Sequence, residues 1–345
     1  MIRLNTNNKN KHMKNNPKIV ITVGDEAGIG PEIILKALAS KELPKEINIL
    51  IVGNKNNLVS KYLFLKSLGL EKIADPDQLN IEDLKISVNN IKEPSNDTGN
   101  ASFLYLQHAI EIVKKSPNTA LVTGPICKKL WNSAGHNYSG QTELLSEMCN
   151  SPNVGMLFTA KSPFTGWRFN TLLATTHIPI KEVPHKLDKN LINSKLDLLY
   201  KFCNKFKEKP TLHVAGLNPH AGEEGLLGTE EVDFINQAIH HWKNKNPLVN
   251  LSQLISPDSC WISSAKAWRG NHTNPPDGIL ALYHDQGLIP VKIITLNYSV
   301  NTTIGLPIIR TSPDHGTGFD IAGKGIAQYQ SMIEAIKTAH DLMIS

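Results

Sequence analysis

The chain has 345 residues, of which 40% are hydrophobic, and a formal net charge of +5. This length and composition predict a soluble globular protein of one large or two moderate domains. The first 18 residues contain five basic residues and no acidic one, so the body is neutral and offers no basic surface for nucleic acid. No apolar run approaches the ~18 residues that a membrane span needs.

The N-terminal segment 1–17 is rich in Asn and Lys and is predicted to be a disordered tail. Met13 offers a second plausible start, so whether the tail is translated stays open. The segment lacks the apolar core of a secretory signal. The four cysteines form no CxxC pair, which excludes a zinc knuckle or redox motif and indicates free thiols in a reducing compartment. We therefore expect a cytoplasmic protein with neither membrane nor nucleic-acid partners.

Short β-branched apolar runs alternate with helical patterns along the chain. This alternation predicts an α/β fold with a largely parallel sheet that is covered on both faces. The predicted strands are 18–23, 47–52, 84–88, 119–123, 154–159, 168–175, 211–215, 278–283 and 291–295. The predicted helices are 32–38, 58–68, 101–115, 187–206, 230–242 and a closing helix to about Met343.

A glycine-rich loop, Gly24–Pro31, joins the first strand to the first helix. It lacks the third glycine of GxGxxG and the Lys-Ser/Thr of a Walker loop. A loop of this kind can present N–H groups to an anion, but a tight structural turn is the favoured interpretation.

Three histidines, His177, His220 and His284, each follow an apolar strand and precede a Pro/Gly turn. Strand ends on one side of a sheet can converge, and three neutral imidazoles suit zinc or another divalent metal. The alternative is a set of unrelated surface histidines. Acceptors that could orient the rings are Asn218, Asp258 and Asp285.

Two basic residues, Lys292 and Arg310, lie beside predicted apolar strands, with Asn301 between them. A half-buried cation needs an anionic partner, which is either a carboxylate of the protein or a phosphorylated or carboxylated substrate. Arg310 is followed by Thr311 and Ser312, and a guanidinium with neighbouring hydroxyls favours an oxyanion.

Seven motifs together resemble the PdxA family of vitamin B6 synthesis, the 4-hydroxythreonine-4-phosphate dehydrogenases. They occur in the family's order, and their joint match is very specific. The motifs are Gly24-Asp-Glu-Ala-Gly-Ile-Gly-Pro-Glu32, Thr123-Gly-Pro125, Gly140-Gln-Thr-Glu143, Thr175-Thr-His-Ile-Pro179, Gly216-Leu-Asn-Pro-His-Ala-Gly-Glu223, Tyr283-His-Asp-Gln-Gly287 with Lys292, and Gly305-Leu-Pro-Ile-Ile-Arg-Thr-Ser312 with Asp314-His-Gly-Thr317.

The resemblance implies one divalent metal per site (Zn, Co or Mg), held by His177, His220 and His284. The third ligand would come from the other subunit of a homodimer, which puts the active site at the subunit interface. Contacts to a phosphorylated small-molecule substrate are implied at Gln141, Thr142, Lys292, Asn301 and Arg310.

Two residues depart from the family's pattern. Gln141 stands where the family usually has histidine, and Gln can form hydrogen bonds but cannot become cationic, so phosphate affinity or its pH dependence is open. Glu26 stands where the family usually has proline, and it is expected to matter little because it lies in a turn.

The segment His315 to Ala327 is similar to the adenine-side loop of the isocitrate and isopropylmalate dehydrogenases. This likeness implies NAD or NADP binding at His315, Gly316, Asp320 and Gly323. It also implies two α/β/α domains of that type with a discontinuous first domain. The expected nucleotide-side domain is 18–130 plus 305–345, and the expected metal and dimer domain is 131–304.

The activity implied by the resemblance is NAD-dependent oxidation of 4-phosphooxy-L-threonine to 2-amino-3-oxo-4-phosphooxybutanoate, which decarboxylates to 3-amino-2-oxopropyl phosphate. Three alternatives stay open. One is a sibling dehydrogenase acting on another phosphorylated hydroxy acid, such as threonate 4-phosphate, or on a dihydrodiol carboxylate. The others are acyl-phosphate chemistry and a non-catalytic metal or phosphate binder.

Overall fold

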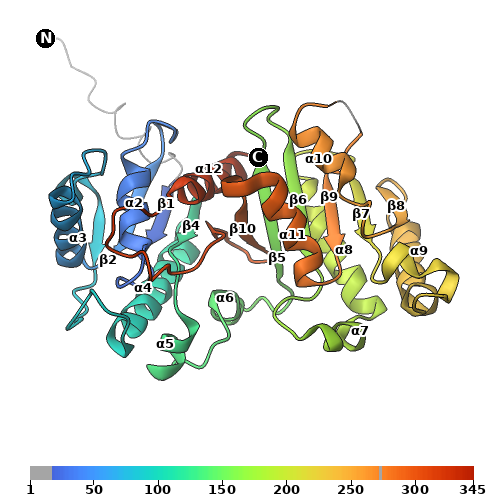
Figure 1. The fold of residues 1–345 in the computed structure, drawn as a ribbon, viewed down its shortest axis with the longest axis horizontal. Coiled ribbons are helices and arrows are strands. Elements are labelled where there is room, and N and C mark those ends of the chain that lie inside the picture. The colour runs from blue at the N-terminus through green and yellow to red at the C-terminus, as the bar shows by residue number, and fades with distance from the viewer. Residues whose placement is uncertain (1–17, 272–273) are drawn as a thin grey trace, which may run out of the picture. The chain divides into compact units, whose positions relative to one another are not determined.

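The computed structural model describes residues 18–271 and 274–345, so the tail predicted at 1–17 lies outside the described residues. The chain divides into two units. Unit 1 is the described part of Met1–Ser151 together with Leu306–Ile344, and unit 2 is Pro152–Gly305. Each unit is a sheet packed with helices, so the predicted α/β class is confirmed (Figure 1).

Unit 1 has a fully parallel sheet in the order β3-β2-β1-β4-β11. Its strands are β1 (Lys18–Thr22), β2 (Asn48–Gly53), β3 (Ile81–Asp83), β4 (Thr119–Thr123) and β11 (Ile309–Pro313). β1 is buried on both faces, because Ile19, Val20 and Ile21 all have no exposed surface. That double burial explains why these strands are continuous β-branched runs without a polar alternation.

The helices of unit 1 are α2 (Gly30–Leu38), α3 (Lys55–Ser67), α4 (Asn96–Lys115), α5 (Lys128–Ser133), α6 (Gln141–Met148) and α12 (Gln330–Ile344). α4 begins with a capping box at Ser95 and packs against β1, β2 and β4, while α12 packs against β11, β4 and α2. Trp131 of α5 and Leu144 of α6 belong to the same core as Phe103 of α4. The first segment of unit 1 therefore ends at Ser151, whereas the boundary predicted from the sequence was at residue 130.

Unit 2 has a mixed sheet in the order β10-β5-β6-β9-β7-β8. Its strands are β5 (Gly155–Lys161), β6 (Arg168–Leu173), β7 (Thr211–Ala215), β8 (Asn250–Ile255), β9 (Gly278–Ala281) and β10 (Val300–Ile304). β5 is antiparallel to both of its neighbours, whereas β6, β9, β7 and β8 are parallel. The carboxyl ends of β6, β9 and β7 consequently lie side by side at one edge.

The helices of unit 2 are α7 (Val183–Lys186), α8 (Lys189–Cys203), α9 (Asn236–Lys245), α10 (Ile262–Trp268) and α11 (His284–Thr295), with a π-helical turn, η4 (Glu231–Ile235), before α9. Both α8 and α11 pack against β6 and β9. A Cβ on Gly278 of β9 would meet Leu199 of α8 at 2.8 Å, so the missing side chain is what lets the helix approach this closely.

The prediction of a strand at 291–295 is wrong, because these residues lie in α11. Gly287 does not turn the chain; it lies inside the helix, where a Cβ would meet Leu173 Cδ2 at 2.5 Å and Ala281 Cβ at 3.0 Å. Close packing of helix on sheet explains this glycine, and the internal Pro290 disguised the helical pattern. The short strand expected at 84–88 lies at Ile81–Asp83, and the elements that were not predicted include β8, β10, β11 and α10.

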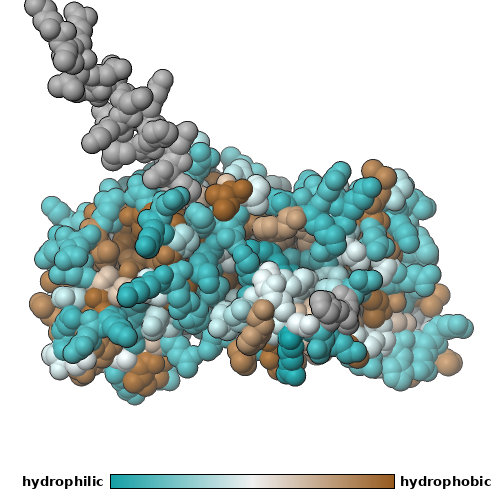
Figure 2. Space-filling model, turned by 90° about the horizontal axis from the view of Figure 1, so that it is seen from above, coloured by the Kyte–Doolittle hydropathy of each residue, from teal (hydrophilic) through white to brown (hydrophobic). Residues whose placement is uncertain are grey.

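Within the described ranges, no helix combines the length and the apolar character that crossing a membrane requires. The face shown in Figure 2 is mostly hydrophilic, with apolar residues in separate patches. All four cysteines are free, as expected.

Candidate active site

The three predicted histidines follow the carboxyl ends of neighbouring parallel strands in unit 2. His177 follows β6, His284 begins α11 directly after β9, and His220 follows β7. Because β9 lies between β6 and β7, the strand that leads to His284 is flanked by the strands that lead to the other two. This edge of an α/β sheet is where such folds place their ligand sites.

Two of the imidazoles lie together. The ring centroids of His177 and His284 are 5.5 Å apart, and the rings are tilted by 46°. Two imidazoles that share one tetrahedral zinc, with Zn–N bonds of about 2 Å, have centroids about 5 Å apart. The spacing of this histidine pair therefore fits a shared divalent cation.

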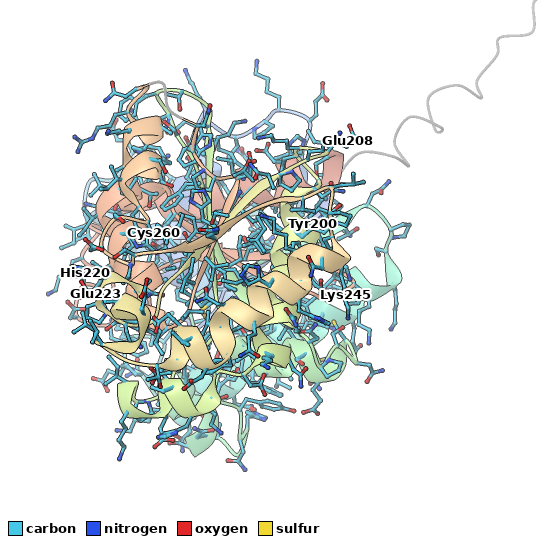
Figure 3. The ribbon with its side chains drawn as sticks, turned by 90° about the vertical axis from the view of Figure 1, so that its right-hand side faces the viewer. Tyr200, Glu208, His220, Glu223, Lys245 and Cys260 are labelled. Carbon is cyan, nitrogen blue, oxygen red and sulfur yellow. The ribbon has the colours of Figure 1, made fainter. Side chains whose placement is uncertain are left out.

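Carboxylates orient two of the three rings. Asp285 Oδ1 lies 2.7 Å from Nδ1 of His284. Glu223 Oε1 lies 2.6 Å from Nδ1 of His220, and these two residues are labelled in Figure 3. A carboxylate only accepts, so each Nδ1 donates the hydrogen bond, and Nε2 is the ring nitrogen that is left to face a metal. The bond from His220 to Glu223 raises the pKa of His220, with a smaller contribution from Asp258. This donor chemistry fits a divalent metal, and Glu223 was not predicted.

His220 does not complete a cluster within one chain. Among the described residues, no three His, Cys, Asp or Glu side chains are arranged to hold a metal ion. The side chain of His220 is 63% exposed. One chain thus presents a histidine pair and an exposed third imidazole.

His220 lies in a left-handed turn (residues 220–225), in which all six residues have positive φ. Only Gly222 and Gly225 are glycines; His220, Ala221, Glu223 and Glu224 have φ between 42° and 58°. The left-handed conformation costs about 1–2 kcal/mol for each residue that carries a Cβ. Such strain persists only where the surroundings impose it, and it clusters at functional sites.

A continuous hydrogen-bond network joins the three strand ends. Thr175 Oγ1, after β6, donates to Leu282 O, and the N–H of Leu282 donates to the side chain of Gln286. Gln286 in turn donates to Gly216 O after β7 at 2.6 Å. Gln286 is buried, so this network fixes the backbone that carries all three histidines. Sequence reasoning did not assign a role to Gln286.

In unit 1, Arg310 and Gln141 are in direct contact. Arg310 is 3% exposed, and its Nη2 donates to Thr123 Oγ1 at 2.7 Å and to Gln141 Oε1 at 3.0 Å. Gln141 Nε2 donates to Gly124 O, and Thr142 follows it in the first turn of α6. Burial lowers the pKa of Arg310 to about 10. A buried guanidinium beside hydroxyl and amide groups is suited to an oxyanion.

The other two predicted substrate contacts belong to unit 2. Lys292 is an exposed residue of α11, the helix that begins at His284. Asn301 lies on β10, opposite Phe158 of β5, and is partly buried.

The predicted nucleotide residues His315, Gly316, Asp320 and Gly323 lie in the loop between β11 and α12. This loop is bonded to α2: Lys36 Nζ donates to the carbonyls of Gly325 and Ala327, and Glu32 accepts from the N–H of Ala327.

The glycine-rich loop after β1 also contacts the nucleotide loop, since Ile29 N donates to Thr317 O. Asp25 N donates to Pro125 O, and a Cβ on Gly24 would lie 2.4 Å from that same oxygen. These contacts favour the interpretation of a tight structural turn.

Glu26, which was expected to matter little, is a buried residue. Its side chain is 1% exposed, and it accepts hydrogen bonds from Asn57 Nδ2 at 2.6 Å and Tyr105 OH at 3.1 Å. Burial raises the pKa of Glu26 to about 7. The two hydrogen-bond partners of this turn residue come from α3 and α4.

Histidines at the carboxyl ends of parallel strands in one unit, and a buried arginine beside a glycine-rich loop in the other, define an α/β enzyme that works at strand ends. The sequence model of a family described as "Pyridoxal phosphate biosynthetic protein PdxA" matches residues 45–339. The chain belongs to this PdxA family.

Its relatives are named as dehydrogenases. The chain is 48% identical over 328 residues to 4-hydroxythreonine-4-phosphate dehydrogenase of Synechococcus sp. (strain RCC307), covering 94% of this chain and 99% of the relative. It is 46% identical to the enzyme of that name from Nostoc sp., covering 99% and 98%. The crystal structure of the Klebsiella pneumoniae enzyme superposes with a TM-score of 0.79 at 29% identity, covering 95% and 99%. The chain is accordingly an oxidoreductase of the dehydrogenase type.

Proposed function

We propose that this enzyme oxidises 4-phosphooxy-L-threonine with NAD, or NADP, to 2-amino-3-oxo-4-phosphooxybutanoate, which loses CO2 to give 3-amino-2-oxopropyl phosphate. The observation that carries the proposal is 48% identity across 99% of a relative bearing that activity in its name. The pairing of His177 and His284 at the sheet edge supports it.

Arg310, Gln141 and Thr142 bind the phosphate in this proposal, with Lys292 and Asn301 as further contacts to the substrate. Binding energy from the phosphate, remote from the reacting carbon, holds the carbinol in position. His177, His220 and His284 would hold a divalent cation such as zinc, which would supply Lewis acidity for a hydroxyl and for negative charge on oxygen. Asp285 and Glu223 accept from the Nδ1 atoms of two of these rings, which would direct the Nε2 atoms toward the cation.

His315, Gly316, Asp320 and Gly323 form the nucleotide site in this proposal. Lys36 and Glu32 act indirectly there, because their bonds hold the end of the same loop. The nicotinamide cofactor would supply the hydride acceptor.

The working form in this proposal is a homodimer in which a second copy covers the groove between α10 and α11. Ile262, Ile289 and Ile293 line this groove and are 52%, 58% and 72% exposed. An apolar surface of this kind on the helix that begins at His284 suits a permanent interface. A second chain would also supply the imidazole that one chain lacks.

Two assays test the proposal. The first follows nicotinamide absorbance with 4-phosphooxy-L-threonine, threonate 4-phosphate and a dihydrodiol carboxylate, each with NAD or NADP and with or without chelator. Turnover of the threonine phosphate that is lost with chelator and restored by metal is expected. Faster turnover of threonate 4-phosphate would favour the sibling activity.

The second assay mixes two inactive variants, His220→Ala and His284→Ala. If the ligand set of one site is divided between two chains, a mixed dimer keeps one intact site, and roughly a quarter of the activity returns. If all three ligands come from one chain, no activity returns.

A further inference from the structure

The left-handed turn that carries His220 is bonded to a buried carboxylate from another part of the chain. Glu231 lies in η4, and its side chain is 1% exposed. Its Oε1 accepts from the backbone N–H groups of Leu217 and Asn218, at 2.8 and 2.7 Å, and its Oε2 accepts from the side-chain amide of Asn218 at 2.8 Å. These three bonds hold the segment between β7 and the turn.

The same carboxylate also contacts the turn itself. A Cβ on Gly222 would lie 2.9 Å from Glu231 Oε2 and 2.9 Å from Gly228 O. Any side chain at position 222 would therefore displace the carboxylate or the turn. Glu231 thus fixes the residues before His220 and packs against the backbone just after it.

Four residues with a Cβ in the left-handed conformation do not hold that shape by themselves. Hydrogen bonds to an ionised carboxylate are about twice as strong as neutral ones, and here they converge beside the strained residues. The bond between His220 and Glu223 orients the ring only while the turn keeps its shape, because both residues belong to it.

We propose that Glu231 is a positioning residue for the metal: it maintains the left-handed turn so that Nε2 of His220 is presented as a ligand. This inference rests on the proposed function, since it requires His220 to bind a cation. Groups that orient metal ligands typically contribute 10- to 100-fold to metal affinity.

The variant that tests this role is Glu231→Gln in the full-length protein. The glutamine oxygen can still accept from the two backbone N–H groups, but its amide would face the Asn218 amide, donor against donor. The measurements are the affinity for Co²⁺ and Zn²⁺ by chelator competition and the absorption spectrum of bound Co²⁺. We expect affinity to fall about 10- to 100-fold, with an altered spectrum.

Glu230→Gln is the matched control. Glu230 is the neighbouring carboxylate and accepts a bond from the Asn218 side chain, not from the backbone N–H groups that Glu231 holds. The metal affinity of the Glu230→Gln protein should stay within about threefold of the wild-type value. Ala221→Gly should restore part of the affinity lost in Glu231→Gln, because glycine adopts positive φ without steric cost and makes the turn less dependent on the carboxylate.

If Glu231→Gln does not fold, Gly222→Ala tests the contact between the turn and Glu231, because the added Cβ would push against the carboxylate. This variant should weaken metal binding to a similar extent. Folded Glu231→Gln, or Gly222→Ala, with wild-type metal affinity would overturn the positioning role alone. A wild-type protein that binds neither Co²⁺ nor Zn²⁺ would instead overturn the proposed function, and the role of Glu231 with it.

Discussion

The polar groups discussed above differ in solvent exposure between the two units. In unit 1, Glu26 and Arg310 are buried and surrounded by hydrogen-bonding partners from several elements. In unit 2, His220 and His284 remain accessible at the sheet edge, and each is oriented by a carboxylate from a nearby residue. In unit 1, burial therefore shifts the pKa values of the charged side chains. In unit 2, the orientation of the exposed rings depends on the backbone that carries them.

This difference determines how each site should respond to substitution. A buried charge is sensitive to its protonation state and to the shape of its partners. An exposed ligand is sensitive to the residues that fix its backbone, and its removal should leave the fold largely intact.

The largest effect is expected for His284→Ala in unit 2. Loss of a ligand should lower metal affinity and turnover by more than about 100-fold, because even groups that only orient ligands contribute up to about that much. Thermal unfolding of the metal-free protein should change little. The control is His185→Ala, at an exposed histidine of α7. Unchanged turnover with full metal occupancy would reject His284 as a ligand.

Glu26→Gln should change stability in a pH-dependent way. The folded-state pKa of Glu26 is raised to about 7 from 4.5, so the stability it contributes is fully present below about 4.5 and is lost as the pH rises through about 7. The variant should match wild type at acidic pH and exceed it by about 3 kcal/mol at about pH 8. Denaturant unfolding at both pH values, with exposed Glu46→Gln as control, measures this difference. Parallel stability profiles would show that Glu26 is not protonated on burial.

Arg310→Lys should weaken phosphate binding in unit 1. Lysine keeps the charge but loses the planar guanidinium whose Nη2 donates to both Thr123 and Gln141. We expect KM for the phosphorylated substrate to rise about tenfold with a smaller change in kcat. The same change at exposed Arg269 serves as the control. An unaltered KM would show that Arg310 does not bind the phosphate.

The smallest effect is expected for Gln141→His, which introduces the residue usual in the family. A histidine there can gain charge, so KM should fall a few-fold as the pH drops below about 6.5. Wild-type protein and a surface variant, Gln237→His, should lack this change. If the profiles coincide, the residue at position 141 does not face the phosphate.

Much of the fold could be predicted from the sequence, because strands buried on both faces give unmistakable β-branched runs such as 18–23. The helical course of α11 was missed, since Pro290 and Gly287 are usually signals of a break. In this helix, Gly287 instead allows close contact with Leu173.

The candidate residues were found as motifs, but the groups that position them were not. Glu231 and Gln286 act through tertiary hydrogen bonds that leave no local periodicity. The left-handed turn offered a partial signal in Gly222 and Gly225, but four of its six residues are not glycine. Burial of Glu26 depends on α3 and α4, which come later in the chain.

The division of unit 1 between the two ends of the chain affects the order of synthesis. β11 and α12 emerge from the ribosome only after all of unit 2 has been made. At that stage the nascent chain contains all of unit 2, whereas unit 1 still lacks strand β11 and the loop that bonds to Lys36. Loss of the last forty or so residues, by a premature stop or by proteolysis, would remove Arg310 and the predicted nucleotide loop, although every histidine of the proposed metal site would already be present.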